Sequence, residues 1–155
     1  MEHCRSDEAH AAATQVLGSK PVQSDQGANI SITPDQYLLH DYTPITPFCI
    51  GHASADGPLL QAVGRGKMEL TTTSGLTLYT PMYYVPSCTG TLLSPDFMCL
   101  ESEGRYRSFR IHGDVVTGHG TIDFCDDLRE CHQIRLTRSN GLWYLANNLM
   151  VPQIT

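Results

Sequence analysis

The sequence predicts an all-β fold with one or two short helices. From about residue 20 onward, short β-rich runs alternate with turns that contain glycine, proline, asparagine or serine, and no long helical period or internal repeat appears. The composition is that of a folded protein, because 41% of the 155 residues are hydrophobic and only 17% are charged. A chain of this length favours a single domain that buries its own core.

The first 20 residues are expected to form a flexible N-terminal segment. Ser6 or Asp7 can cap a short helix that Gly18 ends. This helix has little apolar surface to bury, so we expect it to be frayed or loosely docked.

The next segment predicts a strand, a loop and a helical turn. Val22-Gln23-Ser24 is expected to be a strand that leads directly into a loop at Asp25. Thr33-Pro34-Asp35-Gln36 matches a capping box with proline at the first helical position. It therefore predicts a short helical turn through Tyr37-Leu38-Leu39.

The middle of the chain predicts two β-hairpins. Prolines interrupt the run from Pro44 to Ile50, which favours an edge strand, and the glycine-bounded polar stretch Gly51 to Gly57 predicts a hairpin tip. Lys67 to Thr72 and Leu76 to Val85 predict the clearest hairpin, because both runs are β-rich and Ser74-Gly75 supplies the turn.

The last part of the chain predicts further short strands. Thr91-Leu92-Leu93 is expected to be an apolar strand, and Ser94-Pro95-Asp96 to start a brief helix toward Leu100. Four later runs are expected to be strands: Tyr106 to His112, His119 to Cys125, His132 to Thr137, and Leu142 to Leu145. We expect three parts: residues 1–20, a core at 21–104 and a β-rich extension at 105–155.

Charge and hydropathy narrow the classes of partner. The formal net charge of -6 opposes a nucleic-acid binder, and the arginines of the last strands (Arg105, Arg107, Arg110, Arg135 and Arg138) favour a solvated strand face. No apolar run approaches the roughly 18 residues that cross a bilayer. The start, Met1-Glu2-His3-Cys4, lacks the pattern of a signal peptide, so a cytoplasmic protein without a membrane partner is expected.

Cysteine spacing and histidine positions predict neither a disulfide framework nor a metal site. The six cysteines are irregularly spaced and are expected to be reduced and mostly buried, with a Cys125–Cys131 disulfide as the less favoured alternative. His112, Asp114 and His119 favour surface residues beside a turn over a metal site. Trp143, the only tryptophan, is expected to be a core anchor. No cofactor is implied.

The most informative stretch is Asp25-Gln26-Gly27-Ala28-Asn29. An acid, a glycine two residues later and then a small residue is how retroviral-type aspartic proteases present a catalytic carboxylate on a tight loop. Further motifs follow in order: Gly64-Arg65-Gly66-Lys67, Tyr83-Tyr84-Val85-Pro86, Thr91-Leu92-Leu93-Ser94 and Asn140-Gly141-Leu142-Trp143-Tyr144. Over roughly residues 22 to 148, the chain resembles the protease region of a copia-type LTR retrotransposon polyprotein, running into the segment before the integrase.

This resemblance implies a retropepsin-like closed β-barrel or sandwich and an aspartic endopeptidase that processes its own polyprotein in a cytoplasmic virus-like particle. The implied catalytic residue is Asp25, on an active-site loop with Gln26, Gly27 and Ala28. Implied substrate-binding residues are Asn29, Gly51, Gly57, Leu92 and Leu93. The resemblance also implies a mobile flap hairpin, with a tip at Gly51 to Gly57 or, alternatively, at Thr73-Ser74-Gly75, and a peptide bound as an added strand.

The chemistry of such a site requires two carboxylates. Held about 3 Å apart, they cannot both stay ionised and therefore share a proton. One acts as general base on the attacking water, while the protonated partner stabilises the developing oxyanion. Gly27 permits the sharp turn, and its N–H can donate to the carboxylate. Because the chain holds no second Asp-x-Gly, the sequence predicts a homodimer with one Asp25 from each subunit.

Gln26 departs from the family pattern, which has serine or threonine at this position. In related enzymes that hydroxyl ties the two active-site loops together, whereas an amide is longer and must point elsewhere. This departure, together with the polar Gln23-Ser24 before the loop, supports an alternative: a catalytically inactive module of the same fold, kept for a structural or interaction role. An RNA-binding segment rests only on the scattered arginines.

Overall fold

The computed structural model of the chain describes residues 21–52 and 56–146, and these residues form an all-β fold. The strands are β1 (Val22–Ser24), β2 (Ile32–Thr33), β3 (Leu39–His52), β4 (Leu59–Thr71), β5 (Thr77–Tyr84), β6 (Thr91–Leu93), β7 (Ser108–Asp114), β8 (His119–Cys125), β9 (Cys131–Ser139) and β10 (Leu142–Leu145). A 3-10 helix η1 (Gln36–Leu38) and one α-helix, α2 (Pro95–Leu100), accompany them. The expected flexible segment and helix within residues 1–20 lie outside the described residues.

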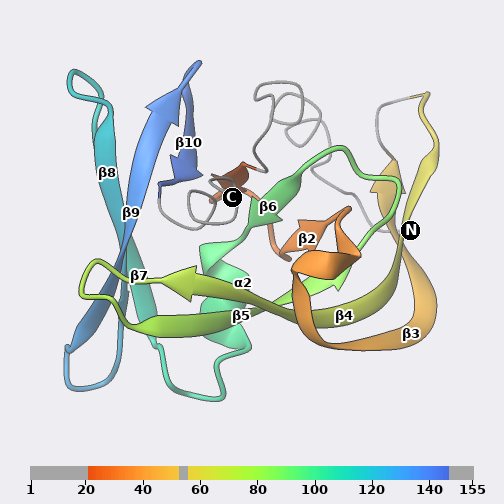
Figure 1. The fold of residues 1–155 in the computed structure, drawn as a ribbon, viewed down its shortest axis with the longest axis horizontal. Coiled ribbons are helices and arrows are strands. Elements are labelled where there is room, and N and C mark those ends of the chain that lie inside the picture. Colours follow the sequence, from red (N-terminus) through yellow and green to blue (C-terminus); the bar gives the residue numbers. More distant parts are fainter. Residues whose placement is uncertain (1–20, 53–55, 147–155) are drawn as a thin grey trace.

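All of these strands belong to one sheet, in the order β3-β4-β5-β2-β6-β1-β10-β9-β8-β7 (Figure 1). In the view, β3 lies on the right and β8 and β9 on the left, and the long β4–β5 hairpin crosses the lower part between them, with β2 and β6 above it. Since β3 and β7 are the two outer strands, the sheet is open. The closed barrel that the resemblance implies is therefore not confirmed.

The two hairpins predicted for the middle of the chain are confirmed. β3 pairs antiparallel with β4 and lies at an edge of the sheet, where prolines are tolerated, and the ladder shifts register between Pro44 and Phe48. β4 pairs with β5 in continuous register from Gly64↔Tyr84 to Thr71↔Thr77. The turn between them needs Gly75, whose φ of 90° is in the left-handed region that glycine adopts without steric cost.

The helical turn predicted after Thr33 is confirmed as η1, but the predicted capping box is wrong. Asp35 precedes η1 without any side-chain cap bond, and η1 ends at Leu38, so that Leu39 already begins β3. The hydroxyl of Thr33 is used elsewhere: it accepts the Asp35 N–H at 3.1 Å and lies 2.8 Å from the hydroxyl of Thr91. Tertiary pairing of β2 next to β6 thus replaces the local helix cap.

The helix predicted at Ser94 is confirmed. Ser94 is its N-cap, and the side-chain oxygen accepts the Phe97 N–H at 3.1 Å. Pro95 occupies the first helical position, where a missing N–H costs nothing, and Asp96 places an acid in the first turn.

Two clusters of buried hydrophobic side chains form the core. The smaller cluster consists of Ile32, Ile50, Leu60, Ala62, Val85, Cys88 and Leu92. The larger cluster consists of Val22, Leu39, Met68, Leu70, Leu78, Met82, Leu93, Met98, Tyr106, Ile122, Phe124, Ile134, Leu136 and Leu145. The larger cluster joins residues on both sides of position 105, and β10 pairs antiparallel with β1, so the C-terminal strands complete the same sheet and core.

The expectation that the cysteines are reduced is wrong for Cys125 and Cys131, which form a disulfide. The two residues are directly opposite in the β8–β9 ladder, with Cα atoms 4.0 Å apart, so the hairpin itself brings the thiols together. Cys49, Cys88 and Cys99 are outside this disulfide and keep their thiols.

Trp143 anchors the C-terminal ribbons, as predicted. Its ring is half-buried against the larger cluster and covers Gly113 of β7 and Gly120 of β8, where any side chain would collide with it. Within residues 21–52 and 56–146, no helix combines the length and apolarity that crossing a bilayer requires.

Candidate active site

The Asp25 loop is held between two strands that lie on either side of β6. β1 pairs parallel with β6 through Gln23↔Leu92 and Ser24↔Leu93, and β2 pairs antiparallel with β6 through Ile32↔Leu92. The chain thus leaves one side of β6 at Asp25 and returns on the other side at Ile32. Because neighbouring strands are spaced by about 4.8 Å, the ends of the loop are fixed roughly 10 Å apart.

The backbone of the loop positions the Asp25 carboxylate. The Asp25 N–H donates to the Leu93 carbonyl at 2.9 Å, which extends the β1–β6 ladder by one residue. The Gly27 N–H donates to Asp25 Oδ1 at 2.9 Å, as predicted, and the Ala28 N–H donates to the Asp25 carbonyl at 3.3 Å. One carboxylate oxygen is therefore fixed by a tight turn directly after the strand.

The second carboxylate oxygen, Asp25 Oδ2, is buried and has no hydrogen-bond partner among the described residues. Only 5% of Asp25 is exposed, whereas the next two residues, Gln26 and Gly27, are exposed. Buried carboxylate oxygens normally accept hydrogen bonds, so Oδ2 is a polar atom of this loop whose bonding is incomplete among the described residues.

Ser94 ties the loop to α2. Its hydroxyl donates to the Ala28 carbonyl at 2.7 Å, and its N–H donates to the hydroxyl of Ser31 at 2.9 Å. Ser94 and Ser31 are both fully buried. The far end of the Asp25 loop is consequently fixed by the same residue that caps the helix.

The predicted substrate-binding residues divide between different environments. Asn29 is exposed immediately after the loop. Leu92 belongs to the smaller cluster with Ile32, while Leu93 faces the other side of β6 and packs in the larger cluster. Of the two leucines, Leu92 is the one on the side of the sheet that the β3–β4 hairpin covers.

The two candidate flap tips also differ. Gly51 and Gly57 flank the end of the β3–β4 hairpin, whose Ile50 and Leu60 pack against Leu92 in the smaller cluster; residues 53–55 of this tip lie outside the described residues. The alternative tip is the β4–β5 turn, where the Thr73 N–H donates to the Gln133 carbonyl of β9 at 2.8 Å. The first hairpin packs on Leu92 of β6, whereas the tip of the second is bonded to β9.

Two buried polar residues beside Asp25 were not predicted as site residues. Gln23 and Tyr144 are cross-strand partners of β1 and β10, and only 4% and 7% of them are exposed. The polar Gln23 within the predicted strand directly before the Asp25 loop was a visible signal for this residue. No signal in the sequence around Tyr144 identifies it as a site residue, because it becomes a neighbour of Gln23 only when β10 pairs with β1.

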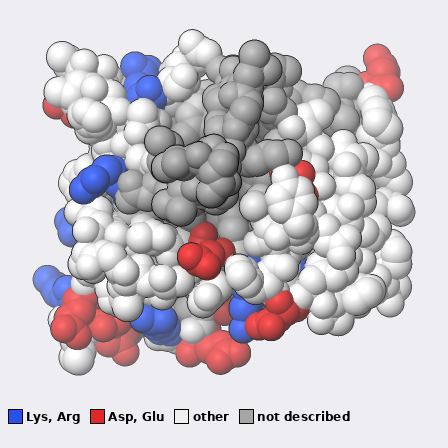
Figure 2. All heavy atoms as spheres, in the orientation of Figure 1, with Lys and Arg blue, Asp and Glu red and all other residues white. Residues whose placement is uncertain are grey.

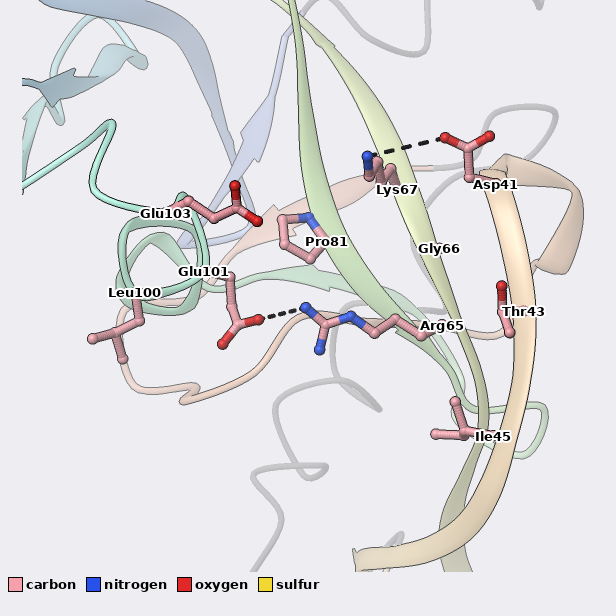
Figure 3. A pocket seen from close by; sticks show the side chains of 10 residues that line it. All are labelled: Asp41, Thr43, Ile45, Arg65, Gly66, Lys67, Pro81, Leu100, Glu101 and Glu103. Atoms are coloured by element: carbon pink, nitrogen blue, oxygen red, sulfur yellow. Dashed lines mark hydrogen bonds and ion pairs between the residues drawn. The ribbon is translucent and has the colours of Figure 1, made fainter.

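A separate cavity of about 530 Å³ lies between the β3–β4–β5 ribbons and the end of α2, and its lining does not include Asp25 (Figure 3). In it, Arg65 pairs with Glu101, donates to the Tyr83 hydroxyl at 2.9 Å and lies 5.6 Å from the Phe97 ring centre. Burial lowers the pKa of Arg65, but the bonds to Glu101 and Tyr83 outweigh it and raise that pKa. Arg65 therefore clamps β4 and β5 to α2.

The surface shows no concentration of one charge sign in the view of Figure 2, where acidic and basic side chains are interspersed along the lower edge. No group of three metal-ligating side chains occurs within the described part of the chain. Asp114, one of the residues weighed for a metal, instead accepts the Val116 and Thr117 N–H groups in a turn.

Comparison with family models, curated proteins and solved structures gives no match to this chain.

Proposed function

We propose that this chain is the protease region of a copia-type LTR retrotransposon polyprotein and acts as a retropepsin-like aspartic endopeptidase. The observation that carries the proposal is the state of Asp25: one oxygen is fixed by the Gly27 N–H, and the other is buried without a partner among the described residues. A carboxylate held in this way has a fixed orientation, and one of its oxygens still lacks a hydrogen-bond partner. In a catalytic dyad, the second carboxylate supplies that partner by sharing a proton.

The proposed active unit is a homodimer. Each chain supplies one Asp25, so two copies related by a two-fold axis provide the two carboxylates. One carboxylate takes a proton from a water molecule that attacks the scissile carbonyl carbon, and the protonated partner donates to the carbonyl oxygen as it becomes negative. Collapse of the tetrahedral intermediate then breaks the C–N bond, and a proton passes to the leaving amine.

The surroundings of Asp25 support preorganisation. The two ends of its loop flank β6, and Ser94 fixes the Ala28 carbonyl, so the carboxylate is placed by strands and a helix cap rather than by a free loop. The β3–β4 hairpin is the proposed flap, because its Ile50 and Leu60 pack on the face of β6 that carries Leu92.

Gln26 is compatible with the proposal. Its side chain is exposed at the tip of the loop. An exposed carboxamide both donates and accepts hydrogen bonds, so it can bond to a partner chain in a dimer, although in a different direction from the usual hydroxyl.

The second candidate is a catalytically inactive module of the same fold. The 5% exposure of Asp25 in the single chain favours it, since neither a substrate nor a second carboxylate reaches Oδ2 without a rearrangement around the loop. The endopeptidase proposal therefore includes the requirement that this region opens when two copies associate or when peptide binds.

The test compares the full chain, expressed with flanking polyprotein, with Asp25→Asn and with Asp96→Asn, an exposed acid in the first turn of α2. Asp25→Asn is expected to reduce processing by roughly a thousandfold or more, as loss of a catalytic group does, while Asp96→Asn leaves it unchanged. Sedimentation at the same concentrations should show a dimer. Unchanged processing in Asp25→Asn, or full activity from a monomer, contradicts the proposal.

A further inference from the structure

Buried polar atoms without a partner gather around β1. Within the described residues they are Gln23 Oε1, Ser24 Oγ, Asp25 Oδ2 and the Tyr144 hydroxyl. Such atoms are rare in folded proteins, because burial removes water without replacing its hydrogen bonds. Their concentration on one short strand and its neighbour β10 points to a place where a ligand supplies the missing partners once the region around Asp25 opens.

Strand register places two of these residues on the same face as Leu92. Gln23 is directly opposite Tyr144 in the antiparallel β1–β10 pair and level with Leu92 in the parallel β1–β6 pair. Side chains at one level of a sheet point to the same face. The face of Gln23 and Tyr144 is therefore continuous with the one that Leu92 and Ile32 share under the β3–β4 hairpin.

Asp25 belongs to this face as well. Only Ser24 separates it from Gln23, and its N–H continues the ladder to Leu93, so the alternation of the strand carries through to Asp25. Ser24 points the other way, level with Leu93 of the larger cluster. Gln23 and Tyr144 are thus the unpartnered polar groups on the side of the candidate catalytic carboxylate.

We propose that Gln23 and Tyr144 form a substrate subsite beside Asp25 that selects a carboxamide side chain, that of asparagine or glutamine, close to the cleaved bond. This inference rests on the proposed function and deepens it, since it assigns a role in substrate recognition to the C-terminal strand β10. In a symmetric dimer, one such subsite lies on each side of the cleaved bond.

The chemistry of the two vacant atoms defines the ligand. Gln23 Oε1 only accepts a hydrogen bond, and the Tyr144 hydroxyl donates one. Burial raises the pKa of Tyr144, so the hydroxyl keeps its proton at neutral pH and remains a donor. A primary amide offers an N–H to the first and a carbonyl to the second, whereas leucine, which has nearly the shape of asparagine, leaves both atoms unpaired.

The experiment uses the full chain carrying Asp25→Asn, so that peptides bind without being cleaved. Its probes are acetylated octapeptides. Each carries asparagine or leucine at one of the four positions nearest the central bond, and calorimetry measures the affinity of each peptide. At one position, asparagine should bind at least about tenfold more tightly than leucine. Adding Tyr144→Phe or Gln23→Leu should abolish this preference, while Tyr79→Phe, at an exposed tyrosine of β5, should preserve it.

Thermal unfolding separates recognition from a structural role. A hydroxyl without a partner contributes nothing to the fold, so Tyr144→Phe should leave Tm unchanged or raise it while the preference disappears. A lower Tm in Tyr144→Phe shows that the hydroxyl is a structural group and overturns the inference. Absence of binding, absence of any preference for asparagine, or a preference that both variants retain also overturns it.

Failure of the proposed function gives a different result. In one outcome, the wild-type chain cleaves none of these peptides, while the Asp25→Asn chain binds them with the asparagine preference. This outcome contradicts the proposed protease activity and supports the subsite. In the other outcome, the wild-type chain cleaves asparagine and leucine peptides equally well. This outcome contradicts the subsite and supports the proposed protease activity.

Discussion

The hydroxyl of Ser94 lies 2.7 Å from the carbonyl oxygen of Ala28, so the N-cap of α2 is also the support of the candidate catalytic loop. One side chain thus satisfies the Phe97 N–H of the helix and a buried carbonyl of the loop at the same time. Helix capping and positioning of the Asp25 loop are consequently coupled, and loss of this hydroxyl is expected to affect both.

Ser94→Ala should therefore destabilise the protein by about 2 kcal/mol or more, from the lost cap and the unsatisfied carbonyl together. Urea unfolding monitored by circular dichroism measures the change. Ser108→Ala, at an exposed serine of β7, is the control and should change stability by less than about 0.5 kcal/mol. Equal effects of the two substitutions would show that the Ser94–Ala28 bond contributes nothing.

Truncation tests whether residues 21–104 fold without the extension, as the expected domain organisation implies. In the structure, removing everything after residue 104 uncovers the edge of β1 and takes Ile122, Phe124, Ile134 and Leu136 out of the larger cluster. The truncated chain should lose cooperative thermal unfolding and bind a hydrophobic dye. A sharp transition in the shortened chain, at a Tm near that of the full chain, would support the division at residue 104 and contradict this prediction.

Local sequence chemistry was sufficient to predict most elements. Ser94-Pro95 specifies a helix start through one hydroxyl and one missing N–H, and Ser74-Gly75 specifies a turn through a positive φ at glycine. The bond from the Gly27 N–H to Asp25 is equally local, since it spans two residues. These features depend on neighbours in the chain, which is why the sequence alone predicts them.

The features that could not be predicted depend on long-range pairing. Thr33 has the sequence of a helix cap, but its hydroxyl contacts Thr91, which becomes a neighbour only when β2 and β6 pair. Tyr144 lies beside Gln23 because β10 joins β1, and no periodicity in either segment reports this. The strand order of the open sheet could not be predicted from the sequence for the same reason, because tertiary packing decides which distant strands pair.

The Cys125–Cys131 disulfide should stabilise the protein by about 2 kcal/mol, the value expected for closing a short loop in the unfolded chain. The Cys125→Ser/Cys131→Ser variant should unfold at a lower temperature than the wild type and should not respond to dithiothreitol, whereas the wild type should fall to the level of the variant when reduced. The number of thiols is obtained by alkylating the denatured chain without reductant and measuring its mass. Modification of all 6 cysteines would show that the disulfide is absent.

Cys99 should react slowly with alkylating agents at neutral pH. Burial raises its pKa from 9.0 to about 11, and the charge of Asp96 adds to this, so at pH 8 roughly one thiol in a thousand is ionised. Peptide-resolved mass spectrometry of iodoacetamide labelling should give a rate far below that of free cysteine, rising with pH up to about 11. The Cys99 thiol ionises at lower pH in the unfolded chain than in the folded protein. Its contribution to the free energy of unfolding therefore falls as pH rises above 9. Asp96→Asn should lower the pKa and speed labelling, and a rate equal to that of free cysteine would contradict the assignment.

Trp143 should require glycine beneath its ring. A Cβ at Gly113 would lie 2.5 Å from a ring carbon of Trp143, so Gly113→Ala forces the ring to move and should cost about 1–3 kcal/mol, as overpacking does. Because Trp143 is the only tryptophan, a red shift of its fluorescence should accompany the loss of stability. The double variant Gly113→Ala/Trp143→Leu should be less unstable than the sum of the two single changes, since the smaller side chain leaves room for the added methyl. Strict additivity in this cycle would show that the glycine and the ring do not interact.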